Sequence, residues 1–238
     1  MGKKLIMKTQ IRKSCFETNS SSMHAIVISK EQVQKDSINI YHGVRFEVHE
    51  FGWEHVRYYD SDFKAMYIWT CVVNNFLKKV YTGKKKKAWD GTEWDEYYLD
   101  LDINNPEYKN IKKTITKYLK NNGFNNDHII FQETFEKEDW GSLRTGYIDH
   151  DPGIGFVKEI LSSEDRFIRF LFNRDSMIET WNDNEWEIDE DVEEALENKY
   201  WDEEKQQYKD GYWDAEEWAH FKLPISEDMI EWKYLKSN

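Results

Sequence analysis

The chain has 238 residues, of which 39% are hydrophobic, 16% aromatic and 33% charged. This aromatic content can bury enough surface for a folded core, which excludes a chain that is disordered for most of its length. No apolar run approaches the roughly 18–20 residues that cross a membrane, and only two cysteines are present, Cys15 and Cys71. We therefore expect a reduced, cytoplasmic protein that does not enter the membrane.

The predicted elements of the first half alternate between strand and helix. Residues 24–29 form a buried strand, and residues 37–41 and 44–48 form a hairpin around His42-Gly43. A long apolar helix covers 61–83, and a second helix covers 106–123, with Pro106 in its first turn and Gly123 after its end. Residues 128–135 form another strand.

The second half continues in the same irregular order. Residues 145–150 form a short strand, 155–161 and 162–172 form two helices, and 176–180 form a strand. An amphipathic helix covers 189–204, and a capping box at 214–217 starts a short one. Strands and helices do not alternate regularly, so we predict an α+β fold with a mixed or antiparallel sheet packed against helices.

Negative charge is concentrated in one block of the sequence. The net charge is −13; residues 181–220 hold sixteen acidic and three basic residues, whereas the rest of the chain holds 30 of each sign. Five of the eleven tryptophans lie in the same block. We expect a core domain at 1–180 and an acidic, aromatic-rich helical segment at 181–238 packed on it.

A polar stretch precedes the first strand. Residues 15–24 read CFETNSSSMH, and their short hydroxyl side chains can surround an anion beside a titratable histidine. The alternative is a turn whose hydroxyls satisfy local backbone groups. The candidate site residues here are Glu17, Ser20, Ser21, Ser22 and His24.

Two further polar segments lie later in the chain. Asp149, His150 and Asp151 end a predicted strand, where they can hold a divalent metal or simply form a turn at Asp151-Pro-Gly. Asp183 lies in WNDNEWEIDED (181–191), where Ile188 occupies the sixth position at which an EF-hand needs glycine; we reject an EF-hand and keep weak calcium binding as an alternative. HEFGWEH (49–55) has Trp53 where a zincin helix needs histidine, so we reject that site too.

A family resemblance connects these segments. RKSCFETNSSSMH (12–24) resembles the N-terminal part of uncharacterised proteins of low-GC Gram-positive bacteria and their phages, which carry an F-E-T-N-S-S-S-x-H signature. YIDH (147–150) and SMIETWNDNE (176–185) are similar to later stretches of the same group. The resemblance supplies no activity and no catalytic residue, but it implies three polar segments that recur together. This chain differs by Trp181 and by the acidic block that follows.

Two functions from different classes follow. The first is a phage- or mobile-element-associated protein that binds a basic partner, for example by inhibiting a host nucleic-acid-binding or defence protein. Its predicted contacts are acidic and aromatic: Glu193, Glu194, Trp201, Asp202, Glu203, Trp213 and Trp218. The alternative is an enzyme acting on a phosphate-containing substrate through residues 17–24, 149–151 and 183–184, with a divalent metal only in that case.

A third hypothesis concerns the most basic stretch. Lys84–Lys87 are predicted to form a loop that binds nucleic acid, although such a loop in an acidic chain is more often only solvated. We predict no cofactor.

Overall fold

The computed structural model describes residues 22–52, 55–87, 91–135, 144–148, 151–182, 195–196, 198–202, 207–209 and 226–236. Within these ranges, helices pack on mainly antiparallel sheets, which confirms the predicted α+β class. The acidic, tryptophan-rich character of a helical C-terminal part stays a prediction, because most of residues 183–225 lie outside the described ranges.

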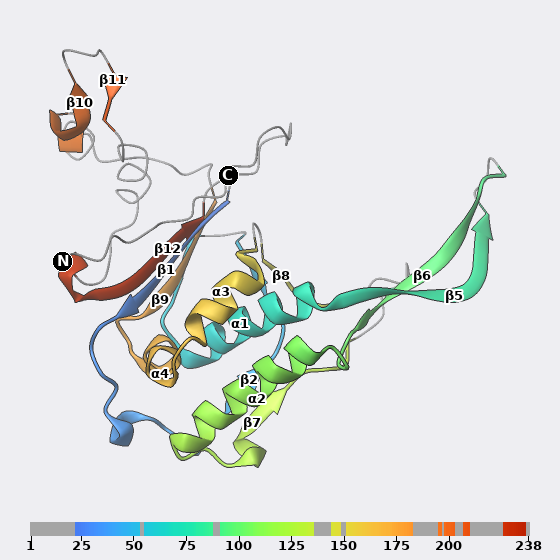
Figure 1. The fold of residues 1–238 in the computed structure, drawn as a ribbon, viewed down its shortest axis with the longest axis horizontal. Coiled ribbons are helices and arrows are strands. Elements are labelled where there is room, and N and C mark those ends of the chain that lie inside the picture. The colour runs from blue at the N-terminus through green and yellow to red at the C-terminus, as the bar shows by residue number, and fades with distance from the viewer. Residues whose placement is uncertain are drawn as a thin grey trace.

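A four-stranded antiparallel sheet forms one side of the molecule (Figure 1). Its order is β12 (Ile230–Lys236), β1 (Ser22–Ser29), β9 (Met177–Asn182) and β4 (Val56–Tyr58). Residues 25–28 of β1 are buried on both faces of the sheet, which explains why this strand is an unbroken apolar run. The strands predicted at 24–29 and 176–180 are therefore confirmed.

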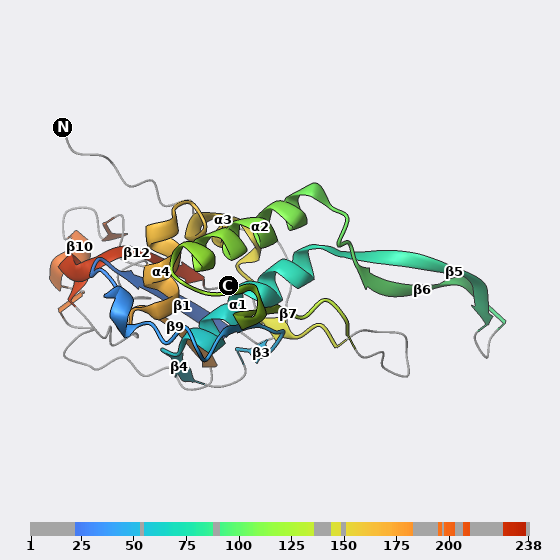
Figure 2. The same cartoon turned by 90° about the horizontal axis from the view of Figure 1, so that it is seen from below.

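Helices cover one face of this sheet in two layers (Figures 1 and 2). The inner layer contains α1 (Ser61–Asn75), α3 (Gly153–Ile160) and α4 (Glu164–Phe172), and α2 (Pro106–Asn121) packs outside on α4. Ser163 Oγ accepts the Arg166 N–H at 3.1 Å and so caps the start of α4. In α2, Pro106 lies in the first turn as expected.

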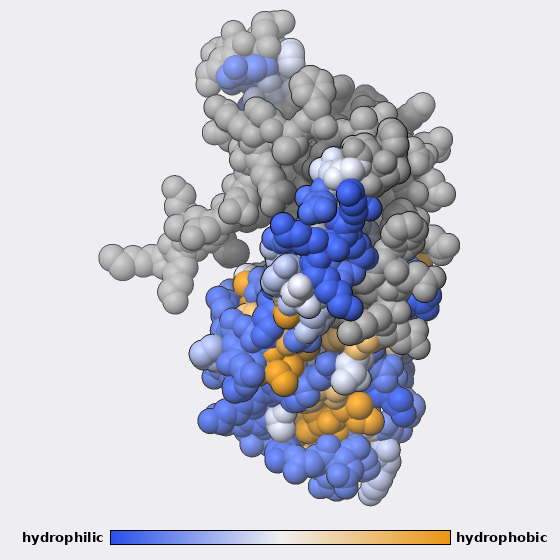
Figure 3. All heavy atoms as spheres, turned by 90° about the vertical axis from the view of Figure 1, so that its right-hand side faces the viewer, coloured by the Kyte–Doolittle hydropathy of each residue, from blue (hydrophilic) through white to orange (hydrophobic). Residues whose placement is uncertain are grey.

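A long β-hairpin projects from the body between α1 and α2 (Figure 1). We call it the arm: β5 (Leu77–Lys87) and β6 (Glu93–Leu101). The predicted helix at 61–83 is wrong beyond Asn75, because the chain leaves the helix at Phe76 and pairs with β6. Viewed from its tip, hydrophilic side chains dominate the arm (Figure 3).

Short strands join distant parts of the chain. β2 (Val44–Phe46) pairs in parallel with β7 (Ile129–Phe131), and β3 (Glu50–Phe51) pairs in parallel with β8 (Tyr147–Ile148). The hairpin predicted at 37–48 is therefore wrong: residues 35–37 form a 3-10 turn, and β2 finds its partner more than 80 residues later. Of the helix predicted at 189–204, residues 195–196 and 198–200 are helical, but β10 (Trp201–Asp202) pairs with β11 (Gln207–Tyr208).

The remaining short elements are 3-10 turns, and the core lies between the helices and the sheet. The turns are Lys35–Ser37, Asn126–His128 and Glu227–Met229. Trp69 and Tyr67 of α1 are among the largest fully buried side chains of the core. α1 is thus the central helix that its nearly continuous apolar sequence predicts.

Candidate functional site

A buried carboxylate lies in the middle of the main sheet. Glu179 is in β9, which has a neighbouring strand on each side, and its side chain is 0% exposed. Glu179 Oε1 accepts hydrogen bonds from His55 Nε2 at 2.7 Å and from Arg57 Nε at 2.8 Å. A carboxylate is kept in a protein interior only when such partners compensate its lost hydration.

Strand pairing explains this arrangement. Arg57 is directly opposite Glu179 in the antiparallel pairing of β4 with β9. His55 lies two residues before Arg57, and residues two apart in an extended chain point to the same side. Both basic side chains therefore converge on one carboxylate oxygen. The other oxygen, Glu179 Oε2, is buried and accepts no hydrogen bond from the residues described.

The carboxylate of the cluster is buried, whereas its two basic side chains are partly exposed. The His55 side chain is 35% exposed and that of Arg57 is 29% exposed, so both reach from the buried carboxylate towards the surface. Partial burial lowers the pKa of Arg57, but the hydrogen bond and charge of Glu179 outweigh this and keep its pKa above the ordinary value. The guanidinium is therefore a permanent cation.

These side chains are of the types that carry out general-base catalysis and anion binding. A carboxylate that accepts a hydrogen bond from one ring nitrogen of a histidine fixes the ring and stabilises its protonated form, which suits a general base. An arginine beside it can neutralise an anionic substrate, because its planar guanidinium matches carboxylate and phosphate groups. We call Glu179, His55 and Arg57 the carboxylate–histidine cluster.

The other face of the same strands carries a second polar group. His24 Nδ1 lies 2.9 Å from the Tyr67 hydroxyl, and both residues are buried. Burial, together with nearby Cys71, Asp151 and Tyr234, raises the pKa of Tyr67 well above its ordinary value. The Tyr67 hydroxyl therefore keeps its proton at any physiological pH.

Two of the three polar segments that the resemblance connects are neighbours in the sheet. In the pairing of β1 with β9, Ser22 is opposite Asn182 and His24 is opposite Thr180. The carboxylate–histidine cluster starts one residue further along, at Glu179. The N-terminal polar segment and the segment ending in N-D-N thus meet at one end of the sheet.

Of the third segment, residues 149–151, the structure describes Asp151, which lies just before α3. Asp151 acts electrostatically on Tyr67, the residue that His24 contacts. Asp151 Oδ1 also accepts the Gly153 N–H at 2.6 Å, so it forms the turn that starts α3. Six predicted site residues lie outside the described residues: Glu17, Ser20, Ser21, Asp149, His150 and Asp183.

The predicted acidic surface is described only in part. Trp201 is 37% exposed in β10, next to Asp202, and its ring lies 5.1 Å from that of Tyr208. The other predicted contacts lie outside the described residues: Glu193, Glu194, Glu203, Trp213 and Trp218.

The lysine stretch at 84–87 is a strand of the arm instead of a loop. Lys85 and Lys87 are opposite Asp95 and Glu93 in β6, and Lys86 Nζ lies 3.0 Å from Glu96 Oε1. The loop prediction is thus wrong, because cross-strand pairing with an acidic partner strand was not visible locally. These pairs offset most of the positive charge of the stretch.

Sequence reasoning missed all three members of the carboxylate–histidine cluster. The signal in the sequence was Glu179 itself, an acidic residue inside the predicted strand SMIET. His55 ends HEFGWEH, which the sequence excludes as a zincin helix. Among the residues described, no group of three or more His, Cys, Asp or Glu side chains could hold a metal ion.

Comparison with known proteins finds no matching family model, no matching curated protein and no matching solved structure. Within the part of the chain that the structure describes, no helix is long and apolar enough to cross a membrane.

Proposed function

We propose that the protein is a hydrolase-type enzyme acting on a phosphate-containing substrate. The observation that carries the proposal is the carboxylate–histidine cluster: a fully buried Glu179 bonded to His55 and Arg57, which are each about one third exposed. Glu179 lies three residues before Asn182, which is opposite Ser22 in the pairing of β1 with β9.

Each residue has a separate role in this proposal. His55 takes a proton from the attacking water or hydroxyl, as a general base. Glu179 is a positioning residue that orients the ring and stabilises the imidazolium as it forms. Arg57 binds the phosphate oxygens through the guanidinium donors that Glu179 and Tyr59 do not use.

The test is hydrolysis of p-nitrophenyl phosphate and bis-p-nitrophenyl phosphate, with and without added Mg²⁺ or Mn²⁺. His55→Asn is expected to lower kcat/KM by about 10²–10⁴-fold, the usual contribution of a general base. His42→Asn is the matched control, because His42 also faces a carboxylate, Asp62 Oδ2 at 3.3 Å, but is 69% exposed on the surface. Absence of turnover in the wild type, or equal activity of both variants, contradicts the proposal.

A second candidate function is binding of a basic macromolecular partner by the acidic segment in a phage-associated, cytoplasmic setting. The exposed Trp201 beside Asp202 favours it, since exposed tryptophans next to charge are frequent interface anchors. Of its seven predicted contacts, these two are among the described residues. Its affinity for a basic protein such as lysozyme must fall with salt and with charge reversal at Glu193, Glu194, Asp202 and Glu203.

A further inference from the structure

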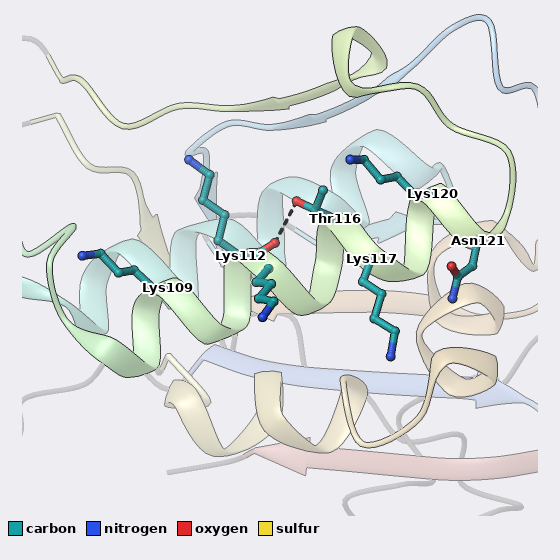
Figure 4. Close-up of a pocket in the computed structure, with 7 residues that line it drawn as sticks. Lys109, Lys112, Thr116, Lys117, Lys120 and Asn121 are labelled. Atoms are coloured by element: carbon teal, nitrogen blue, oxygen red, sulfur yellow. Dashed lines mark hydrogen bonds between the residues drawn. The ribbon is translucent and has the colours of Figure 1, made fainter.

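The outer helix α2 carries a concentrated positive face. Between Pro106 and Asn121 it has five lysines and a single acidic residue, Glu107. The lysines recur at intervals of three, one, four and three residues, which places them along one broad side of a helix. They line a shallow hollow of about 480 Å³ together with Thr116 and Asn121 (Figure 4): Lys109, Lys112, Lys113, Lys117 and Lys120.

Most of this charge is available to a partner. Lys112 Nζ is held by Glu133 Oε2 at 2.6 Å, and Lys109 Nζ bonds to the neutral Asn104 Oδ1 at 3.1 Å. Lys113, Lys117 and Lys120 are exposed and form no ion pair with any residue that the structure describes. This differs from the arm, where acidic residues lie opposite the lysines.

The helix is fixed in position, so the lysines form a rigid row. Tyr108, Ile111, Ile115 and Leu119 on the opposite side are buried in the core. From Lys109 to Lys120 the row extends about 16 Å, at 1.5 Å per residue. A nucleic-acid strand carries one phosphate per about 3.4 Å of helix axis, so the row spans about five phosphates.

We infer that this lysine face of α2 docks on the phosphate backbone of nucleic acid without sequence preference. The hollow contains no aromatic side chain on which a base could stack and no arginine that could read a guanine. A protein partner is disfavoured, because the face lacks the aromatic and arginine anchors that supply affinity in protein interfaces. A membrane is disfavoured, because the apolar side of the helix is buried in the core and cannot insert.

This inference does not depend on the proposed enzyme. It concerns a different element, and a protein that binds nucleic acid through α2 need not hydrolyse it. The excess negative charge of the chain lies in residues 181–220, and the remaining residues have equal numbers of acidic and basic side chains. The positive potential around α2 is therefore not cancelled by acidic residues spread over the whole sequence.

The experiment measures binding of the full chain to a fluorescein-labelled DNA duplex of about 20 base pairs by anisotropy between 50 and 200 mM NaCl. The test variant carries Lys113→Gln, Lys117→Gln and Lys120→Gln. The control carries Lys84→Gln, Lys85→Gln and Lys87→Gln, which removes equal charge from the arm. Glutamine has a similar helix propensity to lysine, so α2 should persist, and equal melting temperatures of the two variants verify this.

The inference predicts that the wild type binds at 50 mM NaCl and that the α2 variant binds more than about tenfold more weakly. The slope of log K against log[NaCl] should fall in magnitude by about 3, at roughly 0.9 per lost contact with a duplex. The arm variant should behave like the wild type. Absence of binding at 50 mM NaCl overturns the inference, as does equal loss in both variants. Equally tight binding of polyglutamate, or of vesicles containing phosphatidylserine, also overturns it.

Discussion

Lys64 is a fully buried lysine in the core of the protein. Its ammonium donates to the carbonyls of Asn173 and Ser176, both at 2.9 Å. Burial lowers the pKa of Lys64 to about 7, although the charges of Asp60 and Asp175 act in the opposite direction. The unfolded chain has an ordinary lysine pKa of about 10.4.

This difference predicts how stability depends on pH. Between about pH 7 and 10 the unfolded state binds one more proton than the folded state, so the free energy of unfolding should rise with pH. The gain from pH 7 to pH 9 is on the order of 2 kcal/mol. Below pH 7 both states are protonated, and Lys64 adds no further dependence.

Urea denaturation at pH 6, 7, 8 and 9 checks this prediction. The comparison is between the wild type and Lys64→Met, which fills a similar volume without a charge. The free energy of unfolding of the wild type, minus that of Lys64→Met, should increase as pH rises from 7 to 9. A constant difference over this range shows that Lys64 keeps its charge in the fold.

Arg57 should be far more important for stability than an arginine in a surface ion pair. Arg57→Gln removes the main countercharge of the buried Glu179 carboxylate, and we expect a loss of about 2–3 kcal/mol, less than the full cost of an unpaired buried charge because His55 remains. Arg45→Gln is the control: Arg45 is 60% exposed and pairs with Glu47 at 3.4 Å, so its loss should cost less than about 0.5 kcal/mol. Equal effects in urea denaturation contradict the prediction.

At the scale of elements, the sequence predicts the helices and strands that are specified by their own residues and immediate flanks. The helix at 106–123 has a proline in its first turn, a glycine after its end and a regular apolar stripe, and α2 follows it closely. The strand at 24–29 is recognised by its short apolar run, and the strand predicted at 176–180 overlaps β9. The helix from Ser61 begins as predicted, but continued apolar residues conceal its end at Asn75.

The errors concern partners that are distant in sequence. Nothing near residues 44–46 indicates that β2 pairs with residues 129–131 instead of forming a hairpin. The candidate site shows the same limit: His55 and Glu179 are 124 residues apart, and only the pairing of β4 with β9 brings them together. His24 was identifiable, because it belongs to an unusual local motif.

The arm should be removable without loss of the fold. Tyr81 and Tyr97 are directly opposite each other and about half-exposed, and residues 82–96 lie beyond them. Replacing 82–96 by Asn-Gly closes a two-residue hairpin at this pair. We expect the free energy of unfolding to change by less than about 1 kcal/mol, because none of the described side chains in this range is buried.

Thermal and urea denaturation of the shortened protein test this expectation. Leu101→Ala is the contrasting variant: Leu101 ends the same hairpin but is buried in the core, and its truncation should cost about 2–5 kcal/mol. Loss of the cooperative transition on shortening the arm means that the arm belongs to the folding unit.

At the scale of the whole molecule, the main sheet connects both ends of the chain. β12, near the C-terminus, pairs with β1, and β9 lies on the other side of β1. Trp232 and Tyr234 of β12 stack on each other, and both lie close to the ring of Phe156 in α3. Because β1 and β9 are central, the polar segments at the ends of these strands are held by the most buried part of the fold.

At the scale of the molecule, negative and positive charge are concentrated in two different segments. The acidic block at 181–220 predicts a partner of positive charge, whereas the lysine face of α2 fits one of negative charge. Composition alone reveals the first, because it is contiguous in sequence. The second emerges only when the helix and its buried side are known.

The central claim is that His55 and Glu179 act as one catalytic unit. A double-mutant cycle of kcat/KM for bis-p-nitrophenyl phosphate, using the wild type, His55→Asn, Glu179→Gln and the double variant, tests it most directly. Residues that work as a unit are strongly non-additive, so we predict that each single variant loses at least about 10²-fold and that the double variant loses little more than His55→Asn alone. Losses that multiply in the double variant, or full activity of His55→Asn, would contradict the claim.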